Sequence, residues 1–254
     1  MLAEAIAWLL TPASRSARRL GHLGESIAIA ARHRRCGAAW APHLAASRQA
    51  LLESARRAPS HRVALVLGSG HLLDVPLAEL AGMFEEVWLV DIVHPWPSRR
   101  AVRRYANVRL IEADVTEWLD ELAGEPAVPA RFLDEARLDW VASVNLLSQL
   151  AHLPQRWLMA NRPDLEADTV IRFGETLMIR HLEWLARFRA PVCLLADVEQ
   201  TRLDARGEVA DTRDYRSLLA GWQINAEWRW DLAPAGELNA GQSAWHRVAA
   251  MTRR

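Results

Sequence analysis

The chain has 254 residues, of which 51% are hydrophobic and 24% are charged, a composition typical of a globular protein with an apolar core rather than of a disordered chain. It contains no lysine, so all 31 of its Lys and Arg residues are arginines. This absence excludes phosphate-loop NTPases, pyridoxal enzymes and Schiff-base aldolases, because each of these classes needs a lysine amine. The formal net charge is zero, so no overall charge indicates nucleic acid or an anionic membrane as a partner.

The first 60 residues differ from the rest of the chain in composition. Residues 1–62 hold ten Arg and three Glu, whereas the remainder has an excess of acidic residues. Ala45, Leu51, Leu52 and Ala55 follow a helical spacing, and the pattern ends at 58–60. We interpret residues 1–60 as a helical N-terminal extension that docks onto an acidic main domain at 61–254. The alternative is a basic arm that contacts RNA or lipid headgroups.

The opening apolar run, residues 2–10, contains Glu4 and is too short to cross a membrane. It predicts a short amphipathic helix rather than a secretion signal, so we expect a cytoplasmic protein. Cys36 and Cys193 lie far apart in the sequence and make no metal-ligand spacing. We therefore expect reduced thiols and no metal site.

Short apolar runs alternate with helically spaced segments through the main domain. The predicted strands are Val63–Leu67, Val87–Val90, Val108–Ile111, Trp140–Val144 and Val192–Ala196. Two later segments, 226–230 and 244–251, are predicted to pair as an antiparallel hairpin. The fold class is therefore α/β, with a doubly wound, mostly parallel, seven-stranded Rossmann-like sheet that ends in this hairpin.

Polar and glycine residues follow the first three predicted strands. Gly68-Ser69-Gly70 comes after the first strand, and a helix is predicted over 77–83. Asp91 ends the second strand and Asp114 follows the third. Ligands of such sheets lie outside the carboxyl ends of the strands, where an acid at the end of the second strand can bind ribose hydroxyls. The order of these residues predicts a nucleoside site.

These residues resemble those of class I S-adenosylmethionine-dependent methyltransferases, over residues 60–254. The resemblance implies that Gly68 and Gly70 face the methionine part of the cofactor, that Asp91 holds the ribose and that Asp114 meets the adenine amino group. The C-terminal hairpin also matches that family's sheet, which has an antiparallel seventh strand beside the sixth. The implied cofactor is S-adenosyl-L-methionine, with a predicted site made of Gly68, Ser69, Gly70, Asp91, Ile92, Asp114, Val115 and Asn145.

The chain also departs from the family pattern. Val66 stands where members often carry an acid, and Leu72 stands where they often have a third glycine. After the fourth strand, 145–149 reads Asn-Leu-Leu-Ser-Gln rather than the Asp or Asn, Pro-Pro and aromatic pattern of enzymes that methylate base amines. This difference counts against a nucleobase amine as acceptor.

Candidates for the acceptor side are Asn145 and His181 as catalytic residues, and Ser148 and Asp197 as substrate-binding residues. His181 also falls on an apolar helical stripe, where a core histidine is the alternative. Asp91 and Asp114 have the alternative of capping a turn or a helix. The charged stretch 197–216 is either a lid or acceptor-binding loop, or a solvated connection.

We interpret the chain as a methyltransferase that acts on a small-molecule acceptor by in-line displacement. One alternative is an NAD(P)-dependent oxidoreductase, because Gly-x-Gly followed by an acid is also its fingerprint. Another is an inactive partner subunit with the methyltransferase fold. We expect no nucleic-acid partner and no membrane span, and the sequence leaves homo-oligomerisation open.

Overall fold

A computed structural model describes residues 7–119 and 124–253. Residues 7–10 are helical, as predicted for the opening run, and the rest of that predicted helix lies outside the described residues. The helices that follow are α2 (Arg15–Arg19), α3 (His22–Ala55), α4 (Leu77–Met83), α5 (Trp96–Val102), α6 (Leu147–Asn161) and α7 (Ala167–Leu185), with a 3-10 turn η1 (Asn239–Gly241). No described helix is long and apolar enough to pass through a membrane.

The centre of the molecule is a single sheet. Its strands are β1 (Val63–Leu67), β2 (Glu86–Asp91), β3 (Val108–Glu112), β4 (Leu138–Val144), β5 (Val192–Leu203), β6 (Val209–Asp214), β7 (Trp222–Ala233) and β8 (Ser243–Arg253). The order across the sheet is β3-β2-β1-β4-β5-β8-β7, and β6 pairs with β5. Strands β1 to β5 are parallel, and β8 is antiparallel to both β5 and β7.

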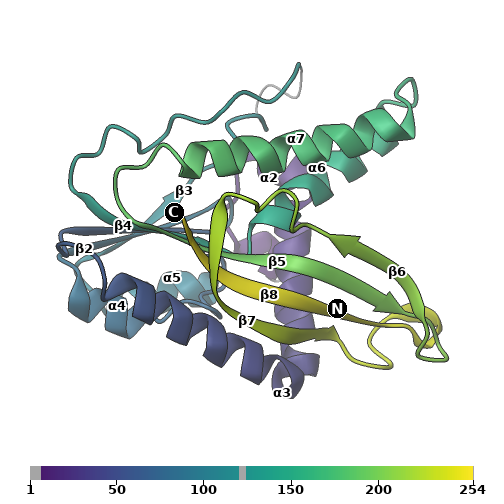
Figure 1. Cartoon of the computed structure of the whole chain (residues 1–254), viewed down its shortest axis with the longest axis horizontal. Coiled ribbons are helices and arrows are strands. Elements are labelled where there is room, and N and C mark those ends of the chain that lie inside the picture. The colour runs from purple at the N-terminus through teal and green to yellow at the C-terminus, as the bar shows by residue number, and fades with distance from the viewer. Residues whose placement is uncertain (1–6, 120–123, 254) are drawn as a thin grey trace.

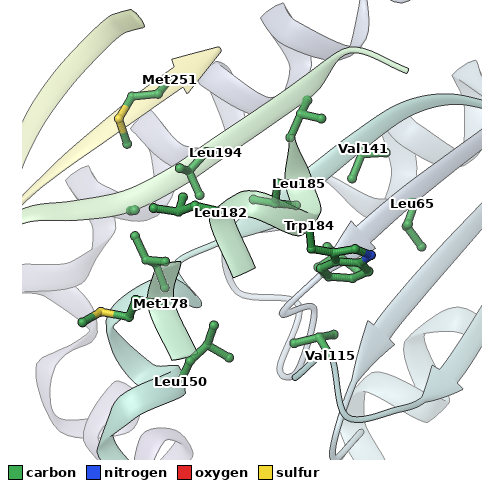
Figure 2. Close-up of a cluster of buried hydrophobic side chains, with 14 of the residues drawn as sticks. Leu65, Val115, Val141, Leu150, Met178, Leu182, Trp184, Leu185, Leu194 and Met251 are labelled. Atoms are coloured by element: carbon green, nitrogen blue, oxygen red, sulfur yellow. The ribbon is translucent and has the colours of Figure 1, made fainter. Parts of the chain in front are cut away.

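Helices cover both faces of this sheet (Figure 1). Side chains of β1 alternate between the faces: Leu65 and Leu67 pack with α6 and α7, whereas Ala64 and Val66 pack with α3, α4 and α5. Figure 2 shows the first of these clusters, in which Met178 and Leu182 of α7 meet the sheet. All side chains of β1 are buried on both faces of the sheet, which explains why this strand is a continuous apolar run.

The doubly wound α/β fold and the C-terminal hairpin are confirmed, but the strand count of seven is wrong. The described residues form eight strands, because most of the charged stretch 197–216 is strand rather than loop. Strand β5 continues to Leu203 and pairs with β8 over this length, and β6 returns along it. All side chains of β6 are exposed, so the stretch lacks the apolar alternation that reveals a strand.

The helical prediction for the N-terminal segment holds for most of its described length, because α3 alone has 34 residues. This helix packs against strand β7 of the sheet. Trp40 Nε1 donates to Leu232 O at 2.9 Å, and Trp140 Nε1 of β4 donates to Ser54 Oγ at 3.0 Å. These bonds fix α3 against strands that come much later in the sequence.

Candidate functional site

A cavity of about 1310 Å³ opens at the carboxyl ends of the parallel strands. Side chains of α3, β7 and β8 also contribute to its walls. Residues predicted from the sequence that line it are Gly68, Ser69, Gly70, Asp91, Ile92, Asp114, Val115, Asn145, Ser148 and Asp197. The topology thus brings the segments after β1, β2, β3 and β4, together with residues of β5 itself, to one cavity.

The glycine loop is shaped by close approach to its neighbours. Gly68 has φ +79°, and a Cβ there would lie 2.7 Å from Val144 O, so no other residue fits. A Cβ at Gly70 would lie 3.2 Å from Asp91 Oδ2. Ser69 Oγ is 3.0 Å from His94 Nε2, and both side chains are buried. Because burial lowers the pKa of His94 to about 4, its ring is neutral at pH 7 and supports the loop without charge.

Asp91 faces the cavity from the end of β2. Gly70 N donates to its Oδ2 at 2.8 Å, and Val93 N donates to its Oδ1 at 3.3 Å. Burial raises the pKa of Asp91 to about 6 even though these backbone hydrogen bonds favour the charged form. Each carboxylate oxygen has two acceptor positions, so Asp91 can still accept hydrogen bonds from a ligand.

Asp114 also lines the cavity, but its carboxylate is used by the local turn. Oδ1 accepts from Thr116 N at 2.8 Å and from Thr116 Oγ1 at 2.7 Å. Oδ2 accepts from Trp118 N and Leu119 N, both at 2.9 Å. Four hydrogen bonds fill the acceptor positions of a carboxylate. The adenine-binding role implied for Asp114 is therefore not supported by this geometry, which favours the capping alternative.

Asn145 joins the loops after β1 and β4. Its φ of +48° is tolerated by asparagine, and its Nδ2 donates to Asp74 Oδ2 at 3.0 Å. His43 Nε2 of α3 lies 3.4 Å from Asp74 Oδ1, and Trp228 Nε1 of β7 donates to His43 Nδ1 at 3.0 Å. Asp74 and His43 were not predicted as cavity residues. His43 could not be found because nothing local in the sequence shows which loop α3 covers.

Ser148 and Asp197 meet at the other side of the cavity. Asp197 Oδ2 accepts from Ser148 Oγ at 2.7 Å and from Gln200 Nε2 at 2.8 Å, and Oδ1 lies 3.2 Å from His246 Nδ1 of β8. Burial would raise the pKa of Asp197, but the nearby His246 ring and the hydrogen bonds from Ser148 and Gln200 outweigh it, so this pKa is lowered. His246 also lines the cavity. When a carboxylate lies beside one nitrogen of an imidazole, the other ring nitrogen can take part in proton transfer.

His181 is not brought to this site. It is 1% exposed, its Nε2 is 2.9 Å from Ser143 Oγ, and it is absent from the cavity lining formed by the described residues. Burial lowers the pKa of His181 to about 3. The candidate catalytic role of His181 is therefore corrected in favour of the core alternative, because its ring is sealed between α7 and β4.

Comparison with known proteins found no matching family model and no matching curated protein. Among solved structures, the chain is similar to Burkholderia thailandensis 1,6-didemethyltoxoflavin-N1-methyltransferase, with 17% identity and a TM-score of 0.42 over 82% of this chain and 78% of that one. It is also similar to DhpI in its complex with SAM and HEP, with 15% identity and a TM-score of 0.41 over 96% and 100%. The N-methyltransferase NodS from Bradyrhizobium japonicum WM9 shares 12% identity, with a TM-score of 0.37 over 80% and 93%.

Proposed function

We propose that the chain is an S-adenosylmethionine-dependent methyltransferase that acts on a small-molecule acceptor. The observation that carries this proposal is the convergence of Gly68, Gly70, Asp91 and Asn145 on one cavity. These residues come from the ends of three adjacent strands, where nucleoside ligands of doubly wound sheets bind.

The residues present fit this cofactor. The two glycine positions leave backbone, rather than side chains, next to the cavity. Asp91 keeps acceptor capacity for a ribose hydroxyl. Ile92 and Val115 add apolar surface to the same wall, which suits the faces of a purine. When bound there, S-adenosylmethionine supplies a methyl group activated by a sulfonium.

The protein's own contribution is to align the acceptor, exclude water and take up a proton where the acceptor carries one. Ser148, Asp197 and His246 are neighbouring polar residues in the cavity lining. His246 is the base in this proposal, because its Nδ1 lies 3.2 Å from Asp197 Oδ1, and a neighbouring carboxylate stabilises the protonated ring that forms when the base takes up a proton.

Calorimetry with S-adenosylmethionine and S-adenosylhomocysteine tests the proposal. We expect saturable binding of both, and Asp91→Ala should weaken it by about 10- to 100-fold through the loss of charge-assisted hydrogen bonds. Glu79→Ala, which removes an exposed carboxylate of α4, is the matched control and should leave binding unchanged. Binding of NADH without binding of either sulfur nucleoside would reject the proposal in favour of an oxidoreductase.

A further inference from the structure

Two buried oxygen atoms in the cavity-lining residues have no hydrogen-bond partner within the described parts of the chain. They are Oδ1 of Asp74 and Oδ1 of Asn145. The hydrogen bond from Asn145 Nδ2 to Asp74 Oδ2, at 3.0 Å, joins the two side chains. A buried acceptor without a donor is costly, so two of them on side chains that are bonded to each other in a cavity indicate a site for a group that donates several hydrogen bonds.

The charge of Asp74 is also uncompensated. Its ion-pair neighbour among the described residues is His43, at 3.4 Å. Trp228 Nε1 can only donate, so His43 Nδ1 accepts and a ring proton is left for Nε2, whose 3.4 Å contact with Asp74 Oδ1 does not have hydrogen-bond geometry. The ring is held in place by stacking on Trp230, with centroids 4.0 Å apart. The network therefore fixes the position of the Asp74 carboxylate without supplying a cation.

The missing partner is best matched by an organic cation. No group of three or more His, Cys, Asp or Glu side chains arranged for a metal ion occurs in the described residues. A primary ammonium has three N–H donors and one positive charge, and hydrogen bonds between ions of opposite charge are the strong ones. The polar pair at Asp74 and Asn145 offers one anionic and one neutral acceptor to such a group.

We propose that Asp74, with Asn145 Oδ1, binds the α-ammonium of the amino-acid end of the cofactor. This inference rests on the proposed function. Asp74 lies on the loop after Gly70, and His43 of α3 lies 3.4 Å from its Oδ1.

The test compares S-adenosylhomocysteine with its analogue lacking the amino group, 5′-deoxy-5′-(3-carboxypropylthio)adenosine, by calorimetry. We expect the wild-type protein to bind S-adenosylhomocysteine about 10- to 100-fold more tightly than the analogue, because the analogue leaves both acceptors unpaired. Asp74→Asn should lose a similar factor for S-adenosylhomocysteine and bind the analogue as the wild type does. Glu79→Gln, the same change at an exposed position of α4, should behave as wild type with both ligands.

Each other outcome has a distinct meaning. Equal affinity of the wild type for the two ligands overturns the ammonium site, and this comparison needs no variant to fold. Equal losses of both ligands in Asp74→Asn also overturn it, because they show that Asp74 only supports the loop. If the wild type binds neither ligand, the proposed function itself fails, and the inference fails with it.

Discussion

Burial and the proposed binding of ribose favour opposite protonation states of Asp91. Its pKa is raised to about 6 by burial, so the free protein holds a proton there under mildly acidic conditions. The stability associated with this proton is present below the pKa of an unfolded aspartate, near 4, and is lost as the pH rises through about 6. Ribose binding by Asp91, as proposed above, would have the opposite preference, because only the ionised carboxylate has all its acceptor positions available.

We therefore predict that the affinity for S-adenosylhomocysteine falls about tenfold between pH 7 and pH 5, with a midpoint near the raised pKa of Asp91. Calorimetry across this range provides the measurement. Asp91→Asn should bind more weakly and show a nearly flat profile. A wild-type profile without this slope would contradict the assignment of Asp91 to the ribose.

Some cavity residues could be predicted from the local sequence, and others could not. Asp91 and Gly68 could be predicted because strand ends and glycine turns are local signals. Asp114 had two local interpretations, and the hydrogen bonds to Thr116 and its neighbours favour the cap. His246 could not be found, since its contact with Asp197 depends on the antiparallel register of β5 and β8, in which Gln200 faces His246.

Helix α3 and strand β7 are joined by a direct side-chain bond. Trp40 is 3% exposed, and its Nε1 donates to Leu232 O of β7. We predict that Trp40→Phe, which keeps an aromatic ring but removes the donor, lowers the free energy of unfolding by about 1 kcal/mol. Urea denaturation measures this change. Trp96→Phe is the control, because Trp96 is 48% exposed, and a loss there equal to that at Trp40 would contradict the role of the bond.

Among the elements, buried strands could be predicted and exposed ones could not. Both ends of β1 were predicted correctly, because all five of its side chains are buried and form a continuous apolar run. β6 has no buried side chain and depends on backbone pairing with β5. The crossover between β3 and β4 was expected to contain a helix, but its described residues form none. Turn hydrogen bonds to Asp114 satisfy part of this backbone instead.

At the scale of the whole molecule, the cavity draws its walls from α3, the parallel strands and the C-terminal hairpin. A ligand that touches all three parts stabilises the folded chain by mass action. We predict that S-adenosylhomocysteine at 100 times its dissociation constant raises the free energy of unfolding by about 2.7 kcal/mol and the melting temperature by about 5–10 °C. Differential scanning calorimetry measures the shift. Adenine alone is the control and should give a much smaller one, and a null result with S-adenosylhomocysteine would contradict the proposed site.

Strand β8 follows every other described strand in the sequence, yet it lies between β5 and β7. Until residues 243–253 have left the ribosome, β5 and β7 cannot be bridged, and each presents a row of open backbone groups. Completion of the sheet must therefore wait until this segment has been synthesised. A premature stop codon shortly before this segment would yield a product in which β5 and β7 each keep an unpaired edge. We expect this product to aggregate rather than to persist as a smaller folded protein.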